Sequence, residues 1–147
     1  MSRGSGGRRL NSVKRMRMGF WALALVVGGA QTWGLREWMG ADGVAYLDMA
    51  EAAANGEWKQ LVNGLWSPLY PAVLSVGRPW AASEAAMVKV VNFGIYVATL
   101  GAFEWFLREW LRRRRRQDGL PEKALTALGY AVFLDSAVTL RNLAIIT

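Results

Sequence analysis

The sequence predicts an all-α, polytopic membrane protein with about three transmembrane helices and short juxtamembrane helices in its first extracytoplasmic loop. Apolar segments long enough to span a bilayer recur along a chain of 147 residues, which leaves little chain for a separate soluble core. Basic residues gather beside these segments and not over one face, which indicates membrane topology and argues against a nucleic-acid partner. Cysteine and histidine are absent, which excludes thiol chemistry and histidine-based acid–base or metal sites.

The first predicted span covers residues 18–35 and contains no charged residue. At about 1.5 Å per residue it reaches about 27 Å, close to the hydrocarbon thickness of a bilayer. Residues 1–17 before it predict a basic cytoplasmic tail, and residues 1–11, rich in Gly, Ser and Arg, predict a flexible segment. A cleaved signal peptide is the alternative, because the apolar run ends in small residues that form a passable processing site.

The second predicted span covers residues 90–107 and contains one acid, Glu104. Arg108 follows one helical turn later, so we expect these two side chains to form an ion pair. The third predicted span covers residues 124–147. Because the chain ends inside this apolar run, we expect the sequence to be an N-terminal piece of a larger helical bundle.

The distribution of charge predicts the orientation of these spans. The tail of residues 1–17 is basic and contains no acid, and residues 112–116 are all arginine. Cytoplasmic flanks carry such an excess of Lys and Arg, so residues 1–17 and 112–123 are expected in the cytoplasm. The loop of residues 36–89, within the region 18–111, then faces outward from the cell (inner) membrane. The arginine run has a second interpretation, the binding of anionic lipid head groups.

The outer loop begins with a predicted helix that Asn55 and Gly56 end. Asp42 precedes its helical pattern, where a carboxylate caps the helix N-terminus. A catalytic carboxylate is the alternative interpretation of Asp42. Tyr46, four residues later, shares its face of the helix. Further positions form two stripes, one apolar (Val44, Leu47, Ala50 and Ala54) and one polar (Asp48, Glu51 and Asn55).

Two further short segments follow in the loop. Apolar residues at helical spacing in residues 57–65 predict a short helix that lies in the membrane interface. Ser67 and Pro68 predict a cap and first helical residue, and the helix that follows, residues 68–76, is about 14 Å long at helical rise and cannot cross a bilayer.

The motifs of this loop resemble those of uncharacterised bacterial multipass proteins that are in turn similar to GT-C glycosyltransferases. The resemblance rests on Asp42-Gly43-x-x-Tyr46-Leu47-Asp48-Met49-Ala50, then Gly56-x-Trp58, then Asn63-x-x-Trp66-Ser67-Pro68-Leu69-Tyr70-Pro71. That superfamily takes sugars from polyprenyl-phosphate carriers. The resemblance implies that Asp42 acts as general base on the acceptor and that Tyr46 supports it. The remaining candidates for support or substrate binding are Asp48, Trp66, Tyr70 and Lys89.

Lys89 enters this set because it lies at the outer end of the second predicted span, where an ammonium group meets a lipid phosphate. The alternative interpretation is that Lys89 has no binding role and that its ammonium group only extends to the membrane interface. No metal site and no cofactor are identified, and the expected donor is a sugar linked to polyprenyl phosphate.

The expected function is therefore that of a membrane glycosyltransferase. Its expected partners are membrane lipid, the lipid-linked sugar donor and an extracytoplasmic acceptor, and no nucleic acid. The alternative is a small, non-catalytic integral membrane protein that uses the outer loop to bind a partner or lipid.

Overall fold

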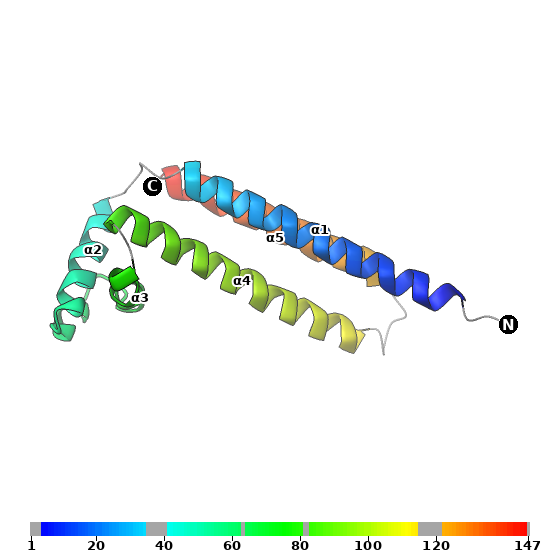
Figure 1. Cartoon of the computed structure of the whole chain (residues 1–147), viewed down its shortest axis with the longest axis horizontal. Helices are drawn as coiled ribbons and strands as arrows, with labels where there is room; N and C mark the ends of the chain where they lie inside the picture. The colour runs from blue at the N-terminus through cyan, green and yellow to red at the C-terminus, as the bar shows by residue number, and fades with distance from the viewer. Residues whose placement is uncertain (1–3, 35–40, 63, 81–82, 115–121, 147) are drawn as a thin grey trace. The chain divides into compact units, whose positions relative to one another are not determined.

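The computed structural model describes residues 4–34, 41–62, 64–80, 83–114 and 122–146, and it leaves the side chains of residues 4–10, 41, 42, 80 and 139–146 undescribed. Within these ranges all the regular secondary structure is helical, and there is no strand (Figure 1). The predicted all-α class is confirmed. The elements are α1 (Gly4–Gly34), α2 (Ala41–Ala54), the 3₁₀ helix η1 (Trp58–Leu61), α3 (Leu69–Gly77), the 3₁₀ helix η2 (Arg78–Trp80), α4 (Glu84–Arg114) and α5 (Glu122–Ile146).

The chain divides into two compact units. The first unit comprises Met1–Val27 and Thr99–Thr147, and the second unit comprises residues 28–98. The first unit contains the long helical segments of α1, α4 and α5, and the second contains the predicted outer loop.

The core of the first unit is formed by side chains from three helices. Phe20 and Ala24 of α1 are buried with Leu100, Leu107 and Leu111 of α4 and Tyr130 of α5. The rings of Phe20 and Tyr130 stack, with centroids 3.7 Å apart. Burying these rings stabilises the unit mainly by removing apolar area from solvent.

Many large apolar side chains lie on the outer surface of the first unit. Large exposed apolar side chains occur on all three of its helical segments: Met18, Leu23, Leu25 and Val26 on α1, Trp105 and Phe106 on α4, and Leu128, Val132 and Val138 on α5. Polar Glu104 and Thr126 are buried. Charged side chains are exposed on this unit as well, among them Arg108, Arg112 and Asp135.

Among the described helices, α4 alone is long and apolar enough, by length and composition, to cross a membrane. It contains the whole of the predicted span 90–107. Within their described residues, helices α1 and α5, which contain most of the other two predicted spans, do not meet the same criterion.

The second unit is built on the packing of α3 against α2. Ala50 of α2, Leu74 of α3 and Met87 of α4 form one buried cluster. Helix α2 ends where the sequence predicts, because Gly56 adopts a positive φ of 90° that suits glycine. The N–H of Gly56 donates to the carbonyl of Ala53 at 3.0 Å, and that of Glu57 to Ala52 at 2.9 Å. This pair of bonds is the Schellman arrangement, which satisfies the last carbonyls of the helix.

Several element boundaries differ from those that the sequence predicts. The backbone is helical from Gly4, inside the segment of residues 1–11 expected to be flexible, and Arg8, Arg9 and Leu10 there are good helix formers. The interfacial helix predicted over residues 57–65 is the single 3₁₀ turn η1, because Val62 is already extended. Helix α3 starts at Leu69, with Pro68 and not Ser67 as its N-cap residue.

The buried stripe of α2 also differs from the prediction. Val44 and Ala54, expected to face the core, are exposed, whereas Met49 and Ala53 are buried with Ala50. Packing against α3 decides which face of α2 is buried. The run of small alanines at the end of α2 does not itself favour one face. The predicted polar stripe is confirmed, since Asp48, Glu51 and Asn55 are exposed.

Candidate functional site

Three of the predicted site residues meet in the second unit. The ring of Tyr46 on α2 packs edge-on against Trp66 at 5.4 Å and against Tyr70 at 5.2 Å between centroids. We call these three residues the aromatic cluster. Tyr46 also contacts both buried clusters of this unit, so its ring joins α2 to α3 and to the segment between them.

Tyr70 extends the aromatic cluster to α4. Its hydroxyl donates a hydrogen bond of 2.8 Å to Oδ1 of Asn92. Burial raises the pKa of the Tyr70 hydroxyl; the bond to Asn92 opposes this rise, and Tyr46 adds to it. The phenol is therefore neutral and a donor at neutral pH. Asn92 is not one of the predicted site residues; its exposed carboxamide interrupts the apolar sequence of the second predicted span.

Asp42, the expected base, lies in the first turn of α2, one residue after the helix begins at Ala41. The sequence predicts a cap position just before the helix, so the observed backbone position differs by a residue or two. The side chain of Asp42 lies outside the described residues. Its position is one helical turn before Tyr46, and residues four apart share a face of a helix. The backbone thus places Asp42 on the face of α2 from which Tyr46 enters the aromatic cluster.

The two remaining predicted residues lie apart from this cluster. Asp48 is exposed on α2, on the predicted polar stripe. Lys89 is half-buried on α4, three residues before Asn92. Positions three apart are neighbours on a helix surface, so Lys89 lies beside the residue that binds Tyr70.

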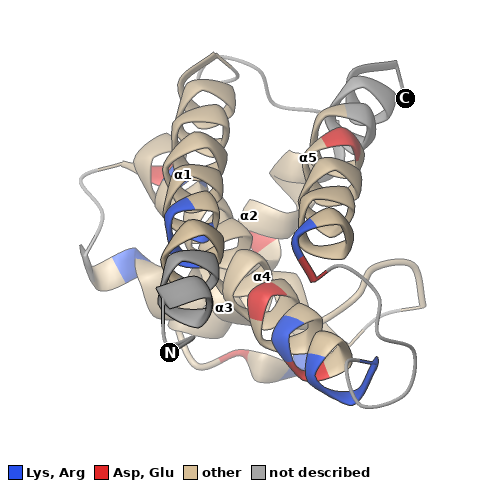
Figure 2. Ribbon diagram, turned by 90° about the vertical axis from the view of Figure 1, so that its right-hand side faces the viewer, with Lys and Arg blue, Asp and Glu red and all other residues tan. Residues whose placement is uncertain are grey.

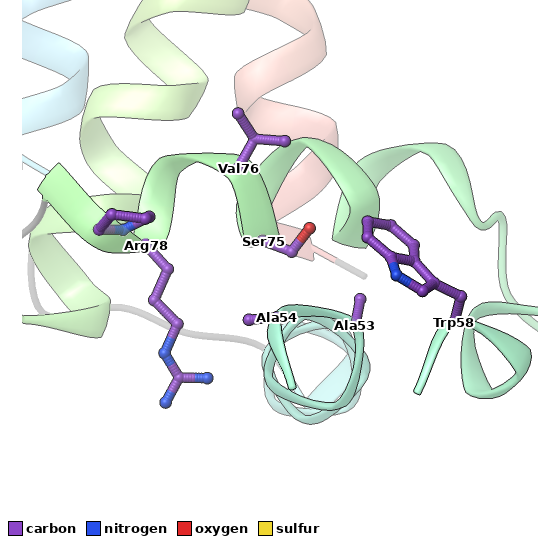
Figure 3. A pocket seen from close by; sticks show the side chains of 7 residues that line it. Ala53, Ala54, Trp58, Ser75, Val76 and Arg78 are labelled. Carbon is purple, nitrogen blue, oxygen red and sulfur yellow. The ribbon is translucent and has the colours of Figure 1, made fainter. Parts of the chain in front are cut away.

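An open cavity of about 360 Å³ lies between α2 and α3, away from the aromatic cluster (Figure 3). Its walls are mainly apolar, with Trp58 and Arg78 at two sides. Nη2 of Arg78 lies 2.9 Å from Oε1 of Glu51. Arg78 is one of the cations that could bind a lipid phosphate, and in this structure it forms an ion pair with Glu51.

A second polar constellation lies in the first unit around buried Glu104. Nε of Arg108 donates to its Oε1 at 2.5 Å, which confirms the predicted pair one turn apart. Two further partners come from other helices: Tyr130 of α5 donates to Oε2 at 2.7 Å, and Nε of Arg17 of α1 lies 3.6 Å from Oε1. Glu104 thereby joins all three helical segments of the first unit.

Basic side chains also mark the end of α4. Its last turn contains Arg112, Arg113 and Arg114, the blue segment at the end of this helix in Figure 2. Nε of Arg112 and Nε of Arg113 both lie 2.9 Å from Glu109. The guanidinium of Arg114 lies 5.5 Å from the centre of the Trp110 ring, in cation–π range.

No known protein family, curated protein or solved structure matches the chain. Any function must therefore be argued from the geometry of the site and from the motifs of the outer loop. Within the described part of the chain, acidic residues form no group of three or more that could hold a metal ion.

Proposed function

We propose that this chain belongs to a polytopic membrane glycosyltransferase of the GT-C type, in which the second unit faces the extracytoplasmic side. The intact protein transfers a sugar from a polyprenyl-phosphate carrier to an acceptor hydroxyl or amine. The observation that carries this proposal is the position of Asp42, in the first turn of α2 and one turn before Tyr46, whose ring packs against Trp66 and Tyr70.

Membrane insertion is supported by two features of the structure. Helix α4 has the length and hydropathy of a membrane span. In the first unit, apolar side chains cover the outside of α1, α4 and α5 while Glu104 is buried and paired. A charged residue that faces the interior of a bundle and pairs there is typical of helices in lipid. On this basis α1 and α5 join α4 as spans.

The proposed chemistry needs one carboxylate. Asp42 accepts the proton of the acceptor as the acceptor oxygen or nitrogen attacks the anomeric carbon of the sugar. The bond between that carbon and the phosphate oxygen of the carrier breaks, and the carrier phosphate leaves with the electron pair. The aromatic cluster fixes the first turns of α2 relative to α3, which holds the base in place.

The test is the transferase activity of the natural full-length protein in membrane vesicles supplied with a radiolabelled polyprenyl-phosphate sugar. Asp42→Asn removes the base without changing side-chain size, so we expect activity to fall by roughly a hundredfold or more. Glu51→Gln is the matched control, because Glu51 is an exposed carboxylate on the same helix and is not one of the candidate site residues, and it should leave activity unchanged.

Two results would count against this assignment. Undiminished turnover by Asp42→Asn removes Asp42 as the base. Equal losses from Asp42→Asn and Glu51→Gln indicate a general effect of charge on the loop, not catalysis.

A second candidate function is a non-catalytic membrane protein whose outer loop binds lipid or a partner. It is favoured by the exposed apolar residues of the second unit, among them Val62, Leu69 and Val76. A full-length protein that is inserted and stable but inactive with every sugar donor tested supports this second candidate.

A further inference from the structure

Helix α3 is apolar on both of its faces. Its inner face buries Pro71, Leu74 and Ser75. Its outer face presents Leu69, Val73 and Val76, which are 72%, 38% and 60% exposed and recur at spacings of four and three residues. In Figure 3, Ser75 points toward α2 and Val76 points away from it. A short helix that is apolar all round needs apolar surroundings on its outer face as well.

The neighbouring helix α2 has the opposite character on its outer face. Asp48, Glu51 and Asn55 are exposed there, at spacings of three and four residues. The packed pair of α2 and α3 is therefore amphipathic as a unit, with charge on the α2 side and aliphatic side chains on the α3 side. Proteins and peptides that lie in a membrane interface show this separation of polar and apolar faces.

Residues of the types that favour lipid head groups lie before and after α3 in the sequence. Trp58 and Lys59 belong to η1, which precedes α3, and Arg78 follows directly after its last residue. Trp58 and Arg78 flank α3 in Figure 3. Indole rings prefer the membrane–water boundary, and cations there are attracted to lipid phosphates.

The contacts of α3 with α4 fix its depth relative to the candidate span. Leu74 packs in one buried cluster with Met87 of α4. A methyl group built at Gly77 would lie 3.0 Å from Val91. These contacts lie within the first turns of a helix of 31 residues. Helix α3, with nine residues, is too short to cross a bilayer and lies at the level where α4 enters it.

We infer that the outer face of α3, formed by Leu69, Val73 and Val76, lies in the interface of a phospholipid bilayer, with the polar face of α2 toward water. The second unit then lies on the membrane surface, and lipid covers the aliphatic face of α3. This inference depends on insertion of α4 and not on sugar transfer, so it goes beyond the proposed function.

The test uses fluorescence from single labelled positions in the full chain, which contains no native cysteine. Val73→Cys is labelled with an environment-sensitive nitrobenzoxadiazole probe and reconstituted into phosphatidylcholine vesicles. Lipids that carry a spin label near the head-group end of the acyl chain should quench most of this emission, which should also be shifted to the blue. Asp48→Cys is the matched control on α2, and its probe should instead be quenched by aqueous iodide.

Either of two results overturns the inference. Quenching at position 73 by iodide and not by spin-labelled lipid places the face in water. Shielding from both quenchers shows that protein covers it. Leu69→Cys repeats the measurement on the same face, and circular dichroism of each variant shows that it folds. A protein inactive as a transferase, but with lipid quenching at position 73, refutes the proposed function and leaves this inference intact.

Discussion

At the scale of single residues, the surroundings of Glu104 explain how a charged carboxylate can be buried between helices. Its carboxylate is 6% exposed and would be costly to bury alone. Arg108, Tyr130 and Arg17 surround it with two cations and a hydroxyl donor. The partners come from three helical segments, so the group defines how these segments align as well as satisfying the charge.

We expect Glu104→Ala to destabilise the first unit by about 1–3 kcal/mol, because it leaves the buried hydroxyl of Tyr130 and the partly buried guanidinium of Arg17 without their acceptor. The measurement is denaturant unfolding in detergent micelles, followed by circular dichroism. Glu109→Ala is the control. Its carboxylate is more exposed and pairs with Arg112 and Arg113 near the end of α4, so the unfolding midpoint should change little. Equal shifts in the two variants would contradict the structural role of Glu104.

The same residues show what sequence can predict at this scale. Glu104 and Arg108 are four positions apart, and helix geometry alone predicts their contact. Arg17 and Tyr130 reach Glu104 from other helices, and no local spacing predicts that. The meeting of Tyr46 with Tyr70 likewise depends on how α3 folds back on α2, although both residues were selected from their motifs.

At the scale of helices, the contact between α1 and α4 in the second unit depends on one glycine. A Cβ atom built at Gly28 would lie 2.3 Å from Cε1 of Tyr96. Only a residue without a side chain lets the ring of Tyr96 lie this close to the α1 backbone. Gly29, the next residue, has no such neighbour within 4 Å.

We expect Gly28→Leu to separate these two helices and to cost about 1–3 kcal/mol of unfolding free energy through overpacking. Gly29→Leu makes the same chemical change on the same helix and should leave stability unchanged or slightly raised, since leucine is the better helix former. Unfolding of both variants in micelles gives the comparison. Equal stability of the two variants would show that Tyr96 does not pack on Gly28.

Element boundaries were predictable where a local rule sets them. Gly56 ends α2 through its positive φ, and Ser83 precedes α4, where its Oγ accepts a hydrogen bond of 3.2 Å from the N–H of Ala86. The interfacial helix expected over residues 57–65 shortened to one 3₁₀ turn. Its apolar spacing is helical, but Trp66 packs on the cluster of Met49, Ala53 and Leu61, and this tertiary contact overrides the local pattern.

At the scale of the whole molecule, the two units share one organisation. Each buries aromatic or aliphatic clusters and still exposes large apolar side chains. The sequence predicted the all-α class because its apolar segments are long and lack the alternation of strands. The number of membrane spans is harder to predict, because α1 and α5 combine apolar runs with polar residues such as Gln31 and Asp135.

The central claim is that the loop holding Asp42 lies across the membrane from the arginine-rich segments. Labelling of single cysteines with a membrane-impermeant maleimide tests it most directly, and the cysteine-free chain gives no background. Asn55→Cys is preferred to a change at Gly56, whose φ of 90° disfavours other residues. Asn55→Cys should react in intact spheroplasts, whereas Asn11→Cys and Gly119→Cys should react only after permeabilisation. Reaction of Asn11→Cys in intact spheroplasts, or of Asn55→Cys only after permeabilisation, would contradict the account.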